Sequence, residues 1–414
     1  MDVELISIGD EIITGHTVDT NTPYIARRLA EIGLSVVYRT AVGDDLTRME
    51  EVILQALKRT DVVIATGGLG PTDDDITKKG IVKVFKRNLV FHEDVLDDLK
   101  QRFAARGIEM PAINQNQALL PQGAVYLPNR IGSAVGIVIV EGGKVFASLP
   151  GVPREMEVIT DEELIPYLQT HLVKQGHLKI HKLRTTGIFE SALAEKIAPY
   201  IKLPENVRLA YLPSFSGVDL RVIASGGTRE MADEAGDKIV AQLRQLTGKY
   251  IYGEGEDTLE SVVGKLLTER SETVSTAESC TAGLLAGKIT DIPGSSKYFL
   301  QGEVTYSNRS KIDFLGVPAE TIEKFGAVSG EVAEAMAAGI LQKAGTDYGI
   351  AITGIAGPDG GTDEKPIGTV FIAVASKKGV ASKKFMMSRD RQSNRGRSVY
   401  AALEMLRRTI LEIE

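Results

Sequence analysis

Short apolar runs rich in β-branched residues alternate with amphipathic segments over most of this chain. VELISIG at 3–9 and DVVIATGG at 61–68 are typical of buried strands, whereas TPYIARRLAEIG at 22–33 has the periodicity of a helix. This alternation predicts βαβ units, and therefore mainly parallel sheets that carry helices on their faces. The pattern returns in the last part of the chain, where DYGIAITGIAGP at 347–358 predicts a strand that enters a glycine loop.

The segment between these two parts shows a different order of elements. Three expected strands and two expected helices follow one another there without the repeated strand–helix alternation, which predicts a small α+β module. At roughly 100–200 residues per domain, a chain of this length is expected to form two or three domains. We therefore expect an α/β protein with two three-layer α/β domains, 1–170 and 256–414, joined by an α+β module at 171–255.

Composition narrows the class of protein. The chain has 414 residues, a net charge of -7 and one cysteine, so neither an internal disulfide nor a cysteine-rich metal site is expected. The acidic balance argues against general binding of nucleic acid. No basic leader precedes an apolar run at the N-terminus, and no run approaches the ~20 apolar residues that a spanning helix needs. We therefore expect a cytoplasmic protein with no membrane partner.

Acidic loops follow three of the expected N-terminal strands. TGGLGPTDDDITK at 66–78 combines glycines that could bring backbone N–H groups to a phosphate with aspartates that would repel it. A divalent cation between carboxylates and phosphate resolves that conflict; the alternative is a capped turn with solvated acids. GDEI at 9–12 and GDDL at 43–46 also follow strands, and the carboxyl ends of parallel strands share one edge of a sheet.

A serine lies at a strand-to-helix junction in STAESCTAG at 275–283. Such a turn can expose Ser279 as a nucleophile, while N–H groups near Thr281–Gly283 could stabilise an oxyanion. We expect the helix to run from 280 to 290. The alternative is that Ser279 only caps this helix.

The base for this serine has to be something other than a nearby histidine. No histidine follows residue 181, which excludes a Ser-His-Asp triad within the last domain. Lysine is the remaining common base, and VTYSNRSK at 304–311 supplies Lys311 together with Tyr306. Cys280 could be the nucleophile instead, or a small buried residue.

Other motifs allow two interpretations each. RDRQSNRGR at 389–397 places arginines before the expected last helix at 396–414, as a phosphate clamp or as a solvated basic helix start. His177 and His181 alternate along an expected strand, so we interpret them as structural. FASLPGVPREM at 146–156 places two prolines at an expected edge of the first domain.

The chain resembles the competence/damage-inducible protein CinA family over essentially its full length. The motifs that carry the resemblance are IGDEIITGHTVDTN, ATGGLGPTDDDIT, SLPGVPREM, AESCTAGLLAGKITDIPGSSKYF, GEVTYSNRSKIDFLGV and TGIAGPDGGTDEKPIGTVFIA. The resemblance implies a molybdopterin-binding-like first domain with metal-dependent ADP-ribose pyrophosphatase activity and a KH-like middle module. It also implies a C-terminal domain that deamidates nicotinamide mononucleotide.

The resemblance also implies roles for individual residues. In the last domain it implies Ser279 as nucleophile, Lys311 as base and Tyr306 as an assisting residue. The implied substrate-binding residues are Glu278, Cys280, Thr281, Gly283, Thr353, Gly354, Ala356, Gly357, Arg391 and Arg395, and in the first domain Asn21, Gly67, Gly68 and Gly70. Asp44, Asp75 and Glu11 are the implied ligands of a divalent ion (Mg, Mn or Co), whereas the deamidase needs no cofactor.

Two further functions stay open. One is a molybdopterin-type ligand-binding protein, against which Leu69 counts because the molybdopterin-binding relatives usually read Gly-Gly-Thr-Gly at this loop. The other is a non-catalytic partner of competence or recombination machinery. We expect small-molecule nucleotides as ligands, no direct contact with nucleic acid, and a homodimer.

Overall fold

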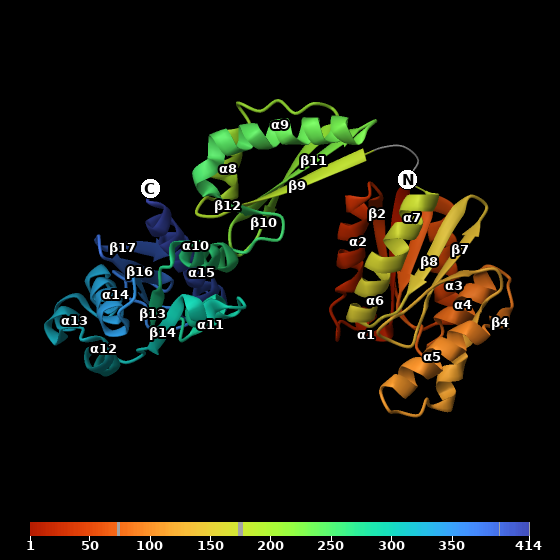
Figure 1. Cartoon of the computed structure of the whole chain (residues 1–414), viewed down its shortest axis with the longest axis horizontal. Helices are drawn as coiled ribbons and strands as arrows, with labels where there is room; N and C mark the ends of the chain where they lie inside the picture. Colours follow the sequence, from red (N-terminus) through yellow and green to blue (C-terminus); the bar gives the residue numbers. More distant parts are fainter. Residues whose placement is uncertain (73–74, 173–176, 389, 414) are drawn as a thin grey trace. The chain divides into compact units, whose positions relative to one another are not determined.

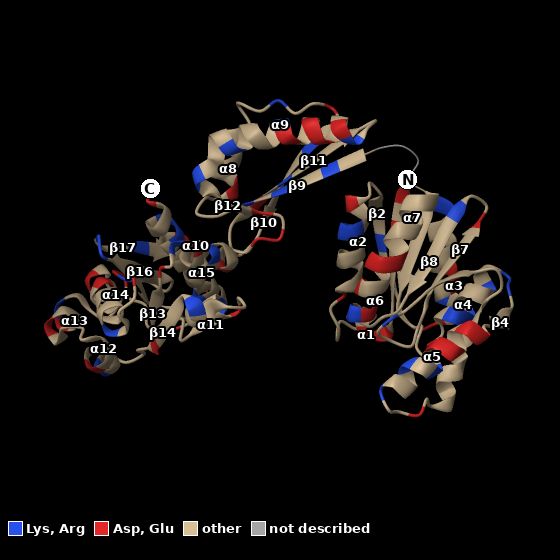
Figure 2. Ribbon diagram, viewed as in Figure 1, with Lys and Arg blue, Asp and Glu red and all other residues tan. Residues whose placement is uncertain are grey.

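The computed structural model describes residues 1–72, 75–172, 177–388 and 390–413 (Figure 1). Its contacts divide the chain into two units. The first comprises Met1–Leu178 with Ser225–Ala232, and the second comprises Lys179–Ala224 with Asp233–Glu414. Basic and acidic residues are interspersed along the elements of both units (Figure 2). Among the described residues, no helix has the length and apolar character needed to cross a membrane.

The first unit is built around one twisted sheet. Its strands lie in the order β2 (Ser35–Val42), β1 (Asp2–Ile8), β3 (Val62–Thr66), β8 (Lys144–Leu149), β7 (Gly136–Glu141) and β6 (Val125–Leu127). The pairs from β2 to β8 are parallel, whereas β7 and β6 are antiparallel to their neighbours. Four carboxyl ends therefore meet at one edge, where ligands bind in open α/β sheets.

Helices cover both faces of this sheet (Figure 1). One face packs against α2 (Asn21–Glu31), α6 (Pro153–Ile159) and α7 (Ile165–His171), with the π-helical turn Thr160–Leu164 between the last two. The other face packs against α3 (Leu46–Arg59), α4 (Thr77–Val84) and α5 (Glu93–Ala105). Smaller elements complete the unit: α1 (Asp10–Ile13), β4 (Leu89–Phe91), η1 (Ala112–Ala118) and β5 (Leu119–Pro121). The result is the expected three-layer arrangement.

The middle segment forms an antiparallel sheet with two helices. Its strands lie in the order β10 (Val207–Pro213), β11 (Val218–Gly226), β9 (His177–Thr185) and β12 (Ile251–Glu254). The helices α8 (Glu190–Ile197) and α9 (Arg229–Thr247) bury apolar residues against this sheet. His181 lies on β9 with its ring 3.0 Å from the Asp237 carboxylate of α9, which agrees with a structural role.

The last segment is a second three-layer α/β arrangement. Its strands lie in the order β14 (Phe299–Val304), β13 (Val274–Glu278), β15 (Tyr348–Gly354), β16 (Thr369–Ser376) and β17 (Gly379–Met386). One face carries α10 (Leu259–Arg270), α11 (Leu284–Thr290) and α15 (Arg391–Leu411), and the other carries α12 (Asn308–Leu315), α13 (Ala319–Phe325) and α14 (Gly330–Ala344). The predicted fold class is confirmed, although this sheet is mixed because β16 and β17 run antiparallel.

Two expected helix starts are wrong. The helix expected from residue 280 begins at Leu284, because Ala282 and Gly283 adopt left-handed backbone conformations. The helix expected from 396 begins at Arg391, because the Asp390 carboxylate accepts the Ser393 N–H and caps it there. Arg391 and Arg395 therefore belong to the helix rather than preceding it, and Arg389 lies outside the described residues.

Candidate active sites

The first candidate site lies at the end of β13 in the second unit. Ser279 is the first residue after this strand, and its N–H donates to the Ile352 carbonyl of the neighbouring β15 at 2.9 Å. The chain then turns sharply through Ala282 (φ 49°) and Gly283 (φ 92°) before α11 begins. This turn holds Ser279, which is 8% exposed, at the carboxyl edge of the sheet.

Lys311 lies next to this serine. Its Nζ is 3.2 Å from Ser279 Oγ, 2.8 Å from the Thr305 carbonyl oxygen and 3.3 Å from the Tyr306 carbonyl oxygen. The side chain extends from the first turn of α12, which Ser307 and Ser310 close with a capping box. Lys311 is 1% exposed, and this burial lowers its pKa from the ordinary value.

The three oxygen atoms around Lys311 can accept all three N–H groups of an ammonium, and the same contacts also suit a neutral amine. A neutral amine has two N–H donors and one lone pair. The two carbonyl oxygens can accept the N–H donors, which leaves the lone pair for the hydroxyl of Ser279. The geometry therefore suits proton transfer from Ser279 to Lys311.

The neighbouring residues Glu278 and Cys280 stabilise the fold, one as a helix cap and the other in the hydrophobic core. The Glu278 carboxylate is 1% exposed and accepts N–H groups from Gly283, Leu285 and Ala286 at 2.8–3.0 Å. It therefore caps α11, the role considered as an alternative for Ser279. Cys280 packs in the hydrophobic core, and burial raises the pKa of its thiol to about 11. A thiol with that pKa is a poor source of thiolate at neutral pH.

The expected oxyanion donors are only partly available. The Gly283 N–H donates to the Glu278 carboxylate, and the Ala282 N–H donates to the Ser279 carbonyl at 3.2 Å. The Thr281 N–H has no protein acceptor in the described part of the chain. Of the three residues expected to hold an oxyanion, Thr281 thus retains a donor that a substrate could use.

Two arginines of α15 reach the same region. Arg391 donates to the Gly357 carbonyl at 2.7 Å and to the Tyr306 hydroxyl at 3.3 Å, while Arg395 donates to the Thr281 carbonyl at 2.9 Å. Arg395 Nε is buried and has no protein partner among the described residues. The helix thus brings cationic groups to both the Ser279 turn and the glycine loop after β15.

Hydrogen bonds and close packing fix the position of the glycine loop after β15. Thr353 donates its hydroxyl to the Ala327 carbonyl at 2.8 Å, and a Cβ at Gly354 would meet Val370 at 2.8 Å. Asn394, which the sequence analysis missed, donates to the Ala356 carbonyl at 3.0 Å and is 1% exposed. Its place between Arg391 and Arg395 is the one signal in the sequence that could have indicated it.

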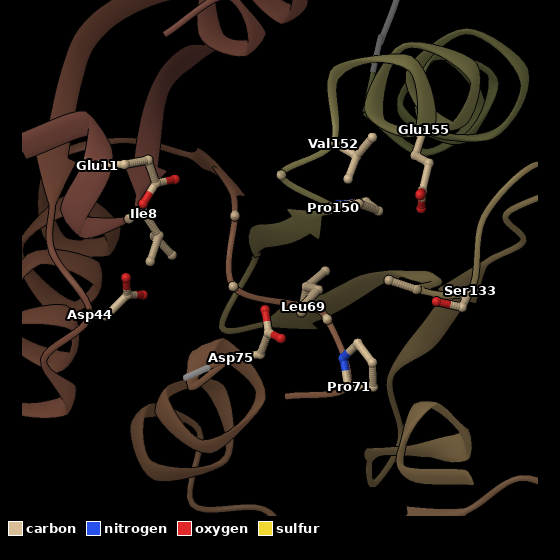
Figure 3. Close-up of a pocket in the computed structure, with 16 residues that line it drawn as sticks. Ile8, Glu11, Asp44, Leu69, Pro71, Asp75, Ser133, Pro150, Val152 and Glu155 are labelled. Atoms are coloured by element: carbon tan, nitrogen blue, oxygen red, sulfur yellow. The ribbon is translucent and has the colours of Figure 1, made fainter. Parts of the chain in front are cut away.

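The second candidate site is a pocket of about 430 Å³ at the carboxyl edge of the first sheet (Figure 3). It brings together Glu11, Asp44 and Asp75 with the glycine loop after β3. The residues that line it are Ile8, Gly9, Glu11, Asp44, Gly67, Gly68, Leu69, Gly70, Pro71, Asp75, Ser133, Ala134, Pro150, Gly151, Val152 and Glu155. Asp73 and Asp74 lie outside the described residues.

The glycine loop has little room for side chains. A Cβ at Gly67 (φ 118°) would lie 2.1 Å from the Ile8 carbonyl oxygen, and one at Gly70 would lie 2.3 Å from Asp75 Oδ2. Leu69 instead turns its side chain into the core, where it is 1% exposed. The loop therefore presents mainly backbone to the pocket, as a phosphate-binding loop requires.

Asn21 braces this loop rather than lining the pocket. Its amide nitrogen donates to Thr66 Oγ1 at 3.0 Å and to the Gly151 carbonyl at 2.8 Å, which ties β3 to the segment after β8. The prolines of that segment were expected at an edge of the domain; Pro153 is exposed, and Pro150 lines the pocket at the carboxyl edge of the sheet. β8 is an inner strand, so Pro150 and the residues after it reach the pocket at the centre of the edge.

The carboxylates of this pocket repel one another. Asp44 and Asp10 exchange backbone-to-carboxylate hydrogen bonds of 3.0 Å, and Asp75 accepts the Thr72 N–H at 3.0 Å. Burial raises the pKa of Asp44, and the negative charges of Asp10, Glu11 and Asp75 raise it further. A bound cation would relieve this repulsion.

The donor set fits a hard divalent cation. Among the described residues, no three His, Cys, Asp or Glu side chains form a ready cluster for a metal ion. An ion such as Mg²⁺, however, is usually held by one or two carboxylates together with water and ligand phosphates. Asp44 and Asp75 could supply those carboxylates on either side of the glycine loop, with Glu11 nearby (Figure 3).

Three successive parts of the chain match known protein families. Residues 4–170 match a family described as "Probable molybdopterin binding domain", and residues 181–253 match "Damage-inducible protein CinA KH domain". Residues 256–410 match "CinA C-terminal domain". These three families follow one another in the order of the three segments described above.

Similar full-length proteins carry related names. A "CinA-like protein" of Dictyoglomus thermophilum is 42% identical over 100% of both chains, and one of Kosmotoga olearia is 41% identical over 100% of both chains. The crystal structure of the competence/damage inducible protein CihA from Agrobacterium tumefaciens is 44% identical, with a TM-score of 0.35. It covers 36% of this chain and 91% of that chain.

Proposed function

The chain belongs to the CinA family, and from this premise we propose that it is a bifunctional hydrolase of pyridine-nucleotide salvage. The C-terminal site would deamidate nicotinamide mononucleotide to nicotinate mononucleotide and ammonia. The N-terminal site would hydrolyse ADP-ribose to AMP and ribose 5-phosphate. The observation that carries the proposal is the 3.2 Å contact between Lys311 Nζ and Ser279 Oγ in a buried site.

In the deamidation, Ser279 Oγ attacks the carboxamide carbon while its proton moves to Lys311 Nζ. The Thr281 N–H would hold the developing oxyanion. The carbon–nitrogen bond then breaks, and the leaving nitrogen takes the proton from Lys311 to depart as ammonia. Water hydrolyses the acyl ester and restores Ser279. Arg391 and Arg395 would hold the phosphate of the nucleotide.

At the N-terminal site, the glycine loop would hold the pyrophosphate through its backbone. Asp44 and Asp75, with Glu11, would hold a divalent ion, which would neutralise charge on the pyrophosphate when bound. Burial and the neighbouring negative charges raise the pKa of Asp44, and a cation at this place would relieve both effects. The homodimer and the cytoplasmic location stay predictions.

Two variants of the full-length chain test the two activities. Ser279→Ala should lower ammonia release from nicotinamide mononucleotide by at least about 10³-fold, because it removes the nucleophile. The same variant should keep ADP-ribose hydrolysis, and Asp44→Asn should give the reverse pattern. Retained ammonia release in Ser279→Ala would contradict the serine mechanism.

A ligand-binding function is the second candidate for the first unit. The match of residues 4–170 to a molybdopterin-binding family supports it. Against it, Leu69 stands where the molybdopterin-binding relatives usually have threonine. A pterin chromophore that copurifies with the wild-type protein, together with no release of AMP from ADP-ribose, would favour this alternative.

A further inference from the structure

A wall of the N-terminal pocket lies across from the predicted metal ligands (Figure 3). It is formed by Ser133 and Ala134 on one side and by Pro150, Gly151, Val152 and Glu155 on the other. Glu155 is the residue of this wall that carries a carboxylate, and its side chain projects toward the cavity and Ser133. None of the motifs that indicated the metal site includes it.

The Glu155 side chain is held in place by Asn129. Glu155 lies in the first turn of α6, and its Oε2 accepts a hydrogen bond of 2.6 Å from Asn129 Nδ2. Asn129 is itself 1% exposed and donates its second N–H to the Ala134 carbonyl at 2.8 Å. Its Oδ1 accepts the N–H groups of Ile131 and Gly132 at 3.1 and 2.8 Å.

This network determines the orientation of the Asn129 amide. Both N–H donors face acceptors and the oxygen faces two donors, so the reversed amide would lose every one of these bonds. Every polar atom of the buried Asn129 amide has a partner, which holds this side chain rigidly. Asn129 therefore fixes one oxygen of Glu155, and Oε1 has no hydrogen-bond partner in the part of the chain that is described.

Gly132 provides the space for the carboxylate. A Cβ at this position would lie 2.0 Å from Glu155 Cδ and 2.4 Å from Oε1. The backbone of Gly132 does not adopt a positive φ, so the close approach of Glu155 is what excludes a side chain there. The site is thus shaped around the position of this carboxylate.

We propose that Glu155 is the general base of the N-terminal hydrolysis, and that Asn129 and Gly132 are its positioning residues. The inference rests on the proposed function. Glu155 accepts a proton from water, the water oxygen bonds to one phosphorus of ADP-ribose, and the bond from that phosphorus to the bridging oxygen breaks. The bridging oxygen leaves with the electron pair on the other phosphate, which gives AMP and ribose 5-phosphate.

Other groups of the pocket are less suited to this task. Asp44 and Asp75 accept backbone N–H groups, and the negative charge of Asp75 acts on Asp44. These two carboxylates are the expected ligands of a cation. Ser133 offers a hydroxyl, which is a poor base at neutral pH. Glu155 combines a carboxylate with a fixed orientation and a place on the pocket wall across from the expected metal ligands.

The test uses Glu155→Gln in the full-length protein, with AMP release from ADP-ribose measured at saturating Mg²⁺. We expect kcat to fall about 10²–10⁴-fold while KM stays within about threefold, since the amide keeps the shape but accepts no proton. Glu157→Gln is the matched control, because it makes the same change on the same helix outside the pocket. It should keep the wild-type kcat.

A second variant tests the positioning role. Gly132→Ala should displace the flexible end of Glu155 without straining the backbone, and so lower kcat. In the Glu155→Gln background, Gly132→Ala should lower kcat no further, because the base whose position it changes is already absent. If Gly132 had only a structural role, the substitution would lower kcat in both backgrounds. A Glu155→Gln protein with wild-type kcat overturns the assignment of Glu155 alone. A wild-type protein that releases no AMP from ADP-ribose overturns both this inference and the proposed N-terminal activity.

Discussion

The buried amine of Lys311 decides the chemistry of the C-terminal site. Its contacts with two backbone carbonyl oxygens and with Ser279 Oγ are all at 2.8–3.3 Å, and the side chain is 1% exposed. Burial penalises the ammonium more than the amine, which is why the pKa falls. A lysine in this environment can act as a base under conditions in which an exposed lysine is protonated.

The pH dependence of ammonia release should show this lowered pKa. The base acts when it is neutral, so kcat/KM for nicotinamide mononucleotide should rise with pH through the pKa of Lys311. It should level off below the ordinary lysine value of 10.5. Lys311→Arg should abolish the activity, because a guanidinium keeps its proton. A rate that keeps rising beyond pH 10.5, or an active arginine variant, would contradict the role of Lys311.

Cys280 should be dispensable for ammonia release. Its thiol is 5% exposed, and its pKa of about 11 leaves little thiolate at pH 7–8. Cys280→Ala should therefore keep kcat within about tenfold of the wild type, a margin that allows for the small cavity created beside Ser279. The measurement is ammonia release at saturating substrate. A loss as large as that of Ser279→Ala would restore the cysteine as the candidate nucleophile.

At the scale of elements, the junction of β13 and α11 shows how a short turn orients a side chain. The Glu278 carboxylate binds three N–H groups of the helix start, so the turn closes back on the end of its own strand. Ala282 adopts φ 49°, which is unfavourable for a residue with a Cβ. The capped helix therefore stabilises a strained turn, and this turn presents Ser279 to Lys311.

Substitutions at Ala282 and Gly283 should change stability in opposite directions. A residue with a Cβ destabilises the folded state by roughly 1–2 kcal/mol when it adopts a left-handed conformation. Glycine instead lowers the free energy of unfolding by about 0.4–1 kcal/mol, because it makes the unfolded chain more flexible. Ala282→Gly should thus raise the free energy of unfolding by about 0.5 kcal/mol. Gly283→Ala should lower it by about 1 kcal/mol or more. Urea unfolding curves of both variants measure these differences, and a destabilised Ala282→Gly protein would contradict the strain.

At the scale of the whole molecule, α15 connects the glycine loop after β15 with the middle segment inside the second unit. Its first residue, Arg391, contacts the glycine loop after β15, and Arg407 donates to the Lys249 carbonyl at 2.9 Å. Glu404 pairs with Arg407 at 2.7 Å and with Arg408 at 2.6 Å. The Arg407 and Glu404 side chains are only 3% and 8% exposed, so this ionic group is largely desolvated.

Removal of the shared carboxylate should destabilise the second unit. Glu404→Ala leaves two arginines without their anion, and breaking a buried ion pair from one side costs about 3–5 kcal/mol. Thermal unfolding, followed by circular dichroism, should show a lower transition for the variant. Lys378→Ala, which removes an exposed pair with Glu412, is the matched control and should change the transition little. Equal stability of the two variants would refute this role of α15.

The two sites should respond differently to metal removal. The expected N-terminal reaction uses a divalent ion between carboxylates and phosphates, whereas the expected deamidation uses Ser279 and Lys311. Excess EDTA should therefore abolish AMP release from ADP-ribose, and added Mg²⁺ should restore it. Ammonia release from nicotinamide mononucleotide should stay within about twofold in the same samples, since no step on Ser279 depends on the chelated ion. Loss of both activities would show that the C-terminal site also depends on a metal.

Local patterns explain what could be predicted from the sequence. The alternation of buried runs and helical periods predicted the layers, because side-chain periodicity reflects which face of an element is buried. The acidic loops at 9–12, 43–46 and 66–78 were expected at one sheet edge, and Glu11, Asp44 and Asp75 do line one pocket. Parallel strands require this, since their carboxyl ends point the same way.

Longer-range contacts explain what the sequence analysis missed. Glu155 lies 26 residues from Asn129, which orients it, so no local pattern connects the two. The start of α11 was misplaced because the helix was extended back to Cys280, whereas the left-handed turn at Ala282 and Gly283 and the cap from Glu278 delay it to Leu284. The start of α15 was misplaced because the capping aspartate, Asp390, lies among arginines that suggested a loop.

The sequence by itself determined the order of elements, the fold class and the candidate groups Ser279, Lys311, Asp44 and Asp75, because periodicity and residue chemistry are properties of short segments. The tertiary structure decided which of these groups meet and in what environment. It placed Lys311 3.2 Å from Ser279 across 32 residues, assigned Glu278 to a helix cap and brought Glu155 to the pocket. Burial, and the pKa changes that it causes, depend on packing between distant segments, so they follow only from the folded chain.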